Sequence, residues 1–437
     1  MKYYFLYIFL ILFINPQLLG QNYTSYFTGS SSDISTITNG GICLMGGASE
    51  DDNAMSWFLQ KANGGDILVL RASGSDGYNN YMYTGLGINV NSVETIVFNN
   101  SSASNEFYIL QKIQQAEAIW FAGGDQWDYV SYWRNSPVDS LINEAIVNRN
   151  IVIGGTSAGM AILGGFYFSA QNGTVTSSTA LSNPYNNNIT VDSSKFIFNQ
   201  IISDVITDTH YDDPDRKGRH VVFLSRILTD YGIVGKGIAC DEYTAVCIDN
   251  NGIASVYGEY PNYDDNAYFI QPNCELIDNN PENCNPNNPL NWNLGNEAIK
   301  VYAAKGTING ANSFDLNNWE TGIGGSWENW YVDNGTLYQQ SGIQPNCSTI
   351  SISKPTEQEI ITLGPNPANK HTIIKLKNPE TSYSLKLINS IGQIQKQIIK
   401  LNSQVFKLDT SRLPSGLYFI EITFDNNKKL IKKLSVL

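Results

Sequence analysis

Histidine is scarce in this chain, which has three in 437 residues. No CxxC pair occurs, and three histidines are too few to suggest a zinc cluster. Beyond the first twenty residues, no apolar run approaches the roughly 20 residues that a membrane-spanning helix needs. The sequence therefore predicts a protein with no metal site and no membrane span, and the chemistry that its motifs indicate needs no organic cofactor.

The first twenty residues have the pattern of a secretory signal peptide. Lys2 supplies a positive charge, residues 5–14 are an apolar run of ten, and Gly20 precedes a plausible cleavage point at Gln21. The run is too short for a membrane anchor. We therefore expect residues 1–20 to be removed on export.

Export would place the six cysteines in an oxidising compartment, where disulfides form. Cys274 and Cys284 flank a polar, turn-rich loop, which makes them the expected local pair, and the remaining connectivity is left open. The other four are Cys43, Cys240, Cys247 and Cys347.

Charge is distributed unevenly along the chain, whose net charge is −13. Residues 360–437 carry 12 Lys/Arg and 4 Asp/Glu, a net charge of +8, so the remainder carries −21. A strongly acidic body disfavours nucleic acid as a partner. It would weakly attract a substrate that carries Arg or Lys, although solubility alone explains the charge more simply.

Short apolar runs between residues 21 and 343, each followed by Gly and a helical stretch, predict an α/β catalytic domain with a mostly parallel sheet. Met55–Ala62 and Val138–Val147 are the clearest helices. Tryptophans in 290–343 fit either a sugar-binding platform or, as we favour, a packed β-rich extension. The strands are expected at 42–45, 67–70, 95–98, 118–122 and 151–153, and the tryptophans are Trp292, Trp319, Trp327 and Trp330.

After a polar linker at 344–359, residues 360–437 predict a small all-β sandwich with strands at 372–376, 383–388 and 417–423. The motifs at 363–368, 391–393, 413–418 and 432–434 resemble the C-terminal type A sorting domain of the type IX secretion system. That resemblance implies passage across an outer membrane and a secreted or cell-surface protein. Whether the tail is removed or anchors the protein is left open.

The sharpest motif is Gly155-Thr156-Ser157-Ala158-Gly159, which follows the apolar run 151–153. A strand that runs into Gly-x-Ser-x-Gly and then a helix is the pattern of a nucleophile elbow. The helix that follows presents the positive end of its dipole to a developing oxyanion. The pattern indicates that Ser157 is a catalytic nucleophile.

A serine nucleophile needs a base and an acid that orients the base. His371 lies in the tail, so the candidate bases are His210, which we favour, and His220. Asp241 and Glu242 end a strand-like segment, and because side chains alternate along a strand, only one of them can face the base.

These segments together resemble cyanophycinase and, more distantly, dipeptidase E, over about residues 40–260. The matching motifs are 46–47, 121–126, 155–159, 208–211 with the arginines after it, and 241–245. The resemblance implies a class I glutamine amidotransferase-like α/β sandwich and assigns roles residue by residue. The nucleophile is Ser157, the base His210 and the third member Glu242; the oxyanion amides belong to Gly124 and Ala158; and the substrate-contacting residues are Asp125, Gln126, Asp208, Arg216 and Arg219.

One segment departs from the family pattern. Tyr211 is followed by the acidic stretch 212–215, with arginines only at 216 and 219, which puts the substrate in doubt more than the catalysis. We expect a secreted serine exopeptidase that hydrolyses cyanophycin or related β-aspartyl peptides to β-aspartyl-arginine-type dipeptides. The alternatives are a peptidase of the same fold for other acidic or isoaspartyl peptides, and a non-catalytic binding protein. Expected partners are the peptide substrate and the type IX machinery, and a homodimer is left open.

Overall fold

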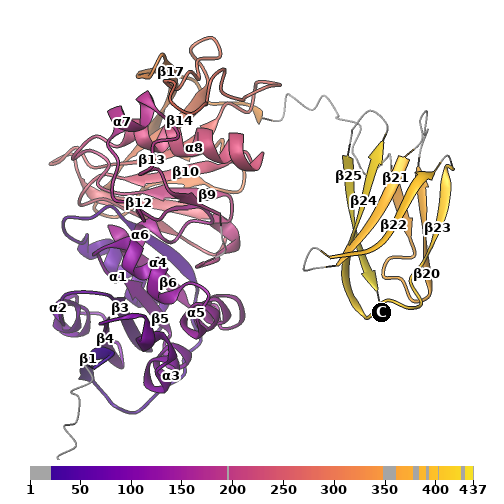
Figure 1. Ribbon diagram of the computed structural model, residues 1–437. Coiled ribbons are helices and arrows are strands. Elements are labelled where there is room, and N and C mark those ends of the chain that lie inside the picture. The colour runs from indigo at the N-terminus through magenta and orange to yellow at the C-terminus, as the bar shows by residue number, and fades with distance from the viewer. Residues whose placement is uncertain are drawn as a thin grey trace, which may run out of the picture. The chain divides into compact units, whose positions relative to one another are not determined.

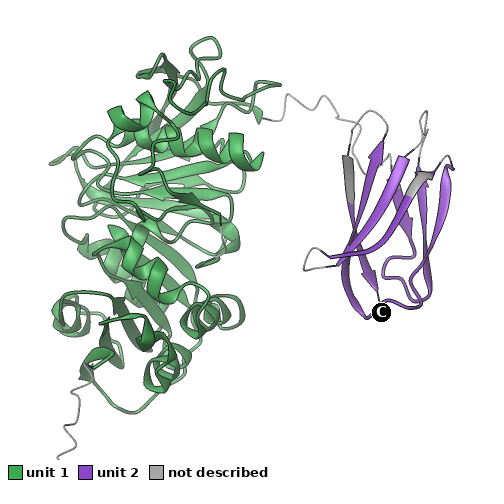
Figure 2. Ribbon diagram, viewed as in Figure 1, with its two compact units in different colours: residues 1–347 green, residues 348–437 purple. Residues whose placement is uncertain are grey.

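The computed structural model describes residues 21–193, 196–347, 361–376, 383–389, 393–401, 403–424 and 429–436. The chain divides into two compact units, residues 1–347 and 348–437 (Figure 2). The predicted signal peptide and residues 348–359 of the predicted linker lie outside the described residues. None of the helices in the described ranges has both the length and the apolar character needed to cross a membrane.

A ten-stranded sheet forms the lower half of the first unit in Figure 1. Its five strands β4, β3, β5, β6 and β2 are parallel, and the flanking strands pair antiparallel. In sheet order the strands are β1 (Tyr23–Gly29), β4 (Ser92–Phe98), β3 (Asp66–Arg71), β5 (Ala118–Phe121), β6 (Val152–Thr156), β2 (Gly41–Met45), β11 (Ala245–Ile248), β12 (Ile253–Tyr260), β15 (Asn312–Asp315) and β16 (Gly322–Ile323).

The parallel strands are buried along almost their whole length because helices cover both faces of the sheet, and most of their residues are apolar. Glu94 and Thr95 in β4 are buried polar exceptions. In β2, Cys43 and Met45 pack in the cluster that contains residues of α1, whereas Ile42 and Leu44 pack in the cluster that contains residues of α3 and α5. This alternation follows from the two-residue period of a strand. The helices are α1 (Asp52–Lys61), α2 (Gly77–Asn80), α3 (Phe107–Gln115), α4 (Gln126–Trp133), α5 (Pro137–Asn148), α6 (Ala158–Ala161), α7 (Ser177–Ser182) and α8 (Lys217–Tyr231), with helical turns η1 (Tyr81–Gly85), η2 (Ser101–Asn105) and η3 (Gln200–Ile202).

The predicted α/β fold with a mostly parallel sheet is confirmed in this region, and its five expected strands and two clearest helices are present. Helix α1 begins where Asp51 accepts hydrogen bonds from two backbone N–H groups of its first turn. Helix α5 begins with Pro137 in its first turn after the capping side chain of Ser136.

A second sheet of six strands lies above the first in Figure 1, and only its β9–β10 pair is parallel. The remaining neighbours pair antiparallel, and the sequence reading of a mostly parallel sheet did not foresee this layer. In sheet order its strands are β18 (Thr336–Ser341), β17 (Gly325–Asp333), β14 (Ile299–Lys305), β13 (Asn266–Pro272), β10 (Lys236–Cys240) and β9 (Val205–Asp208), and a separate pair is formed by β7 (Tyr167–Phe168) and β8 (Val191–Asp192).

The tryptophans of 290–343 pack in this unit. Trp292, Trp319 and Trp330 are buried, and the ring of Trp327 contacts Tyr302. The expectation that they pack, and do not form an exposed platform, is therefore confirmed for the three buried residues.

The expected disulfide between Cys274 and Cys284 is wrong. Cys274 is bonded to Cys347, 73 residues away in the sequence, and Cys284 is a buried free thiol beside Ser225. The polar loop after Cys274 carries Cys284 into the core against α8, so proximity in sequence did not decide the pairing. The bond also ties Cys347 to the first unit.

The second unit consists of a three-stranded and a four-stranded antiparallel sheet around one apolar cluster. Such a pair of small sheets is the β-sandwich that the sequence predicted. In sheet order the strands are β19 (Ile361–Gly364), β20 (His371–Leu376) and β23 (Val405–Asp409), and then β22 (Ile394–Leu401), β21 (Tyr383–Asn389), β24 (Gly416–Phe424) and β25 (Lys429–Val436).

Candidate active site

Ser157 lies on a sharp turn between β6 and α6. Its backbone has φ +51° and ψ −118°, a conformation that costs energy for a residue with a side chain. A Cβ on Gly155 would lie 2.6 Å from the backbone of Gly159, and a Cβ on Gly159 would lie 2.0 Å from the carbonyl oxygen of Phe121. Both flanking positions therefore require glycine because the backbone passes so close there.

Three side chains form a continuous hydrogen-bonded chain. Ser157 Oγ lies 2.7 Å from Nε2 of His210, and Nδ1 of the same imidazole lies 2.5 Å from Oε1 of Glu242. Ser157 follows β6 of the first sheet, whereas His210 and Glu242 follow β9 and β10, the parallel pair of the second sheet. The group therefore gathers where the carboxyl ends of strands from the two sheets meet. His210 and Glu242 are partly exposed, at 21% and 22% of their side chains, so solvent and a substrate can reach the group.

Two backbone segments hold the imidazole and the carboxylate in place. The N–H of His210 donates to the carbonyl of Gly46 at 2.9 Å, and a Cβ on Gly47 would lie 2.4 Å from the imidazole. The N–H of Glu242 donates to Oδ1 of Asp212 at 2.9 Å. From the sequence, Asp212 is expected in an acidic loop that either meets a substrate guanidinium or is solvated, and no sequence signal connects it to Glu242.

Asp241 and Glu242 do face different surroundings. Asp241 is buried, and its Oδ2 accepts hydrogen bonds from the backbone and the side chain of Asn266 at 3.1 and 2.9 Å. Burial raises the pKa of Asp241 to about 7, although the bonds from Asn266 oppose the shift. Glu242 is thus the carboxylate that contacts the imidazole, and it lies in the turn after β10, not in the strand itself.

The other two histidines lie elsewhere. His220 is fully buried in α8, where its Nε2 lies 3.2 Å from the carbonyl of Ile206. Burial lowers the pKa of His220 to about 4, so the ring is neutral at neutral pH. His371 begins β20 of the second unit. Of the two candidate bases in the first unit, only His210 contacts Ser157.

The two segments expected to supply oxyanion amides lie beside the nucleophile. Ala158 is the first residue of α6, so its N–H has no acceptor within that helix. A Cβ on Gly123 would lie 3.6 Å from Cβ of Ser157, and the buried hydroxyl of Tyr129 contacts the carbonyls of Ala122 and Gly123 at 2.9 and 3.0 Å. This contact fixes the loop that carries Gly124.

Asp208 and Arg219, both predicted to contact substrate, are paired with each other. Nε of Arg219 donates to Oδ2 of Asp208 at 2.8 Å and Nη2 donates to Oδ1 at 2.5 Å, with only 4% and 3% of the side chains exposed. Burial alone would raise the pKa of Asp208, but the charge and hydrogen bonds of Arg219 hold it below its usual value. The pair therefore lies beneath the site surface.

The remaining predicted contacts are more accessible. Arg216 is half-buried, and its Nη1 lies 3.5 Å from Oγ1 of Thr209. Burial and the charge of Arg219 lower the pKa of Arg216. Asp125 is exposed and caps α4, and Nε2 of Gln126 lies 3.4 Å from a backbone carbonyl.

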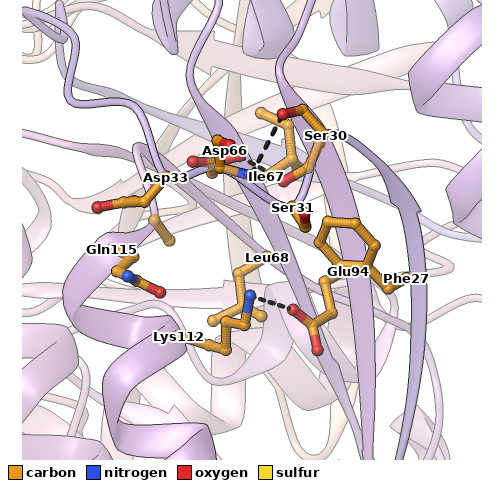
Figure 3. Close-up of a pocket in the computed structure, with 13 residues that line it drawn as sticks. Phe27, Ser30, Ser31, Asp33, Asp66, Ile67, Leu68, Glu94, Lys112 and Gln115 are labelled. Carbon is orange, nitrogen blue, oxygen red and sulfur yellow. Dashed lines mark hydrogen bonds and ion pairs between the residues drawn. The ribbon is translucent and has the colours of Figure 1, made fainter.

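The crevice in Figure 3 is not part of this group. It lies where β3 and β4 begin, the end of the parallel strands opposite to the one that carries Ser157. Lys112 and Glu94 close it with an ion pair of 3.0 Å, and its volume of about 30 Å³ suits water, not a peptide.

Comparison with known proteins gives two family matches. Residues 53–256 match peptidase family S51, and residues 362–436 match the secretion system C-terminal sorting domain. Solved structures with similarity include a peptidase from an acI-B1 Actinobacterium, at 14% identity over 53% of this chain and 91% of that one, TM-score 0.39. A putative peptidase E protein from Listeria monocytogenes EGD-e matches at 15% identity over 51% and 99%, TM-score 0.33. A DUF3244 family protein with an immunoglobulin-like β-sandwich fold from Bacteroides vulgatus matches at 15% identity over 17% and 83%, TM-score 0.16.

Proposed function

We propose that this chain is an exopeptidase acting on cyanophycin or related β-aspartyl peptides. The premise is that it is a serine-type peptidase, with residues 53–256 matching peptidase family S51 and a type IX sorting domain that directs it to the cell surface or the extracellular space. The observation that carries the proposal is the hydrogen-bonded chain from Ser157 through His210 to Glu242. The products are β-aspartyl-arginine-type dipeptides.

The first half of the reaction acylates the serine. Oγ of Ser157 adds to the substrate carbonyl carbon while its proton passes to Nε2 of His210, 2.7 Å away. Glu242 accepts the hydrogen bond from Nδ1, which fixes the tautomer and stabilises the imidazolium. Collapse of the tetrahedral intermediate breaks the C–N bond, and the imidazolium protonates the leaving amine.

The second half reverses these roles with water. His210 removes a proton from water, the hydroxide adds to the acyl carbon, and Ser157 leaves with its proton restored. In both halves the amides of Ala158 and Gly124 stabilise the oxyanion. One such hydrogen-bond donor lowers the activation free energy by about 3–4 kcal/mol in serine hydrolases.

Charge around the site supports a substrate with both carboxylate and cationic groups. Arg216 is the predicted cation whose side chain is not enclosed in an ion pair, so we assign it to a substrate carboxylate. Asp208 and Arg219 position this region from below. The acidic stretch at 212–215 adds negative charge at the rim, which suits an arginine-bearing peptide.

Ser157→Ala tests the proposal. Purified mature protein should release β-aspartyl-arginine dipeptide from cyanophycin, and it should cleave oligomers of β-aspartyl-arginine faster than oligomers of β-aspartyl-leucine. The variant should lose nearly all turnover while it melts at the same temperature. A fluorophosphonate probe should label the parent and not the variant. A variant as active as the parent would refute the mechanism, and activity on neither cyanophycin nor any other β-aspartyl peptide would refute the substrate.

A further inference from the structure

A cavity of about 730 Å³ lies beside the catalytic group and is not used by the mechanism above. Its volume falls within the roughly 300–1,000 Å³ of small-molecule sites. The lining comes from the chain after β2, the start of α1, the turn after β10, the end of β12 with the loop that follows it, and the turn after β14. The residues are Ser49, Glu50, Asp51, Asp52, Asn53, Tyr243, Glu259, Tyr263, Asp265 and Ile308.

The wall of this cavity is continuous with the triad. Tyr243 directly follows Glu242, and its N–H donates to the carbonyl of Gly47 at 3.1 Å, the same glycine that packs against the imidazole of His210. Ser49, two residues beyond Gly47, also lines the cavity. A peptide whose scissile bond lies at Ser157 therefore has this cavity beside it.

The lining is strongly acidic and contains no basic residue. Five of its side chains are carboxylic acids, and none of these five forms an ion pair with any residue that the structure describes. Burial raises the pKa of Asp51 and of Asp265, although backbone N–H groups that bond to each carboxylate oppose the rise. Such uncompensated charge makes the cavity favourable for a cation.

Two exposed tyrosines complete the cavity. Tyr243 is 53% exposed and Tyr263 is 64% exposed. Tyr243 also has φ +61°, which is unusual for a bulky residue. Exposed aromatic faces attract a guanidinium or ammonium group, so the tyrosines and the carboxylates favour the same kind of ligand.

We propose that this cavity is the subsite that binds a cationic side chain of the substrate, with Glu259 and Tyr243 as specificity-determining residues. The inference deepens the proposed function and rests on it. Glu259 is the sharpest probe because its side chain is exposed, whereas the carboxylate of Asp52 accepts a hydrogen bond from the hydroxyl of Tyr81 and that of Asp51 caps α1.

The test compares cleavage of an oligomer of β-aspartyl-arginine with cleavage of the same oligomer built from β-aspartyl-citrulline, its neutral isostere. For the parent, kcat/KM should favour arginine by about tenfold or more, and added salt should narrow the ratio. Glu259→Gln should reduce the ratio about 2- to 5-fold through KM, and Glu259→Lys should reduce it about tenfold or more. Glu144→Gln on α5, where Glu144 pairs with Arg149 at 3.8 Å, removes one carboxylate away from the cavity and should leave the ratio unchanged.

Binding of the two dipeptides to Ser157→Ala protein, measured by calorimetry, makes the test independent of turnover. The subsite is supported if Ser157→Ala protein binds the arginine dipeptide more tightly than the citrulline dipeptide and the double variant with Glu259→Lys does not. Equal binding of both dipeptides, or a preference that survives the added substitution, overturns the subsite even if the parent cleaves both oligomers. Failure of the parent to hydrolyse any β-aspartyl peptide would instead refute the proposed function.

Discussion

Arg219→Ala separates a structural role of this arginine from a surface contact with substrate. The structure encloses the guanidinium, with 4% of the side chain exposed, and joins it to Asp208 by two hydrogen bonds. Removing one partner leaves a buried carboxylate uncompensated at the end of β9, which costs about 3–5 kcal/mol. For a domain of this size each kcal/mol lowers the melting temperature by about 2 °C, so we expect a loss of roughly 6–10 °C.

The pH dependence of this loss has a definite sign. In the parent, the pKa of folded Asp208 lies below the usual pKa of an aspartate. The ion pair therefore stabilises the fold fully at pH values above that usual pKa. This stabilisation is lost as the pH falls through the lower pKa of the folded state. Without Arg219, burial raises the pKa of Asp208. The difference in stability between the parent and Arg219→Ala should therefore be largest near pH 7.5 and smaller near pH 5.

Thermal melts at both pH values provide the assay. Asp208→Asn combined with Arg219→Met removes both charges and should restore much of the stability, whereas Lys305→Ala, which breaks the exposed pair with Asp264, should cost about 1 kcal/mol or less. If Arg219→Ala melts with the parent and only its KM for acidic peptides rises, the buried-pair argument is wrong and the surface contact predicted from sequence is right.

Further predictions concern the triad and the disulfide. Glu242→Gln should lower kcat far more than Asp241→Asn, because only Glu242 contacts the imidazole; the reverse order in steady-state assays would refute the assignment. Because the pKa of Asp241 is raised in the folded state, its ionisation should make the parent less stable as the pH rises from about 4 to about 7. Asp241→Asn should make this decrease in melting temperature smaller. Gly47→Ala should abolish turnover with little loss of secondary structure by circular dichroism, as its Cβ would lie 2.4 Å from the imidazole. Cys347→Ser should destabilise the first unit by about 4 kcal/mol in denaturant titrations, because the bond to Cys274 closes a long loop; an unchanged midpoint would contradict this.

The candidate site shows where sequence reasoning stopped. Short motifs identified Ser157 and narrowed the base to two histidines, because a nucleophile elbow and a rare residue type are local signals. The contact of Asp212 with the N–H of Glu242 carries no such signal, since a carboxylate in a loop reads as solvated. The acidic cavity was missed for the same reason: Glu50 and Glu259 lie far apart in the chain and meet only in the folded protein.

The sequence by itself determined the local elements and the division of the chain. Apolar runs of three to five residues indicated the parallel strands, because a strand covered on both faces is mostly apolar. Gly155 and Gly159 marked the elbow because no larger residue fits where the backbones approach so closely. The tail was recognisable as a separate β-sandwich from its composition and motifs.

Only the tertiary structure decided which distant groups meet. The pairing of Cys274 with Cys347 depends on how the loop after β13 folds over α8, and the mostly antiparallel second sheet depends on hairpins that no periodicity specified. The burial of Arg219 against Asp208 changed the expected role of both residues. Each outcome is set by packing between segments far apart in sequence, whereas residue spacing reports only the conformation of one segment at a time.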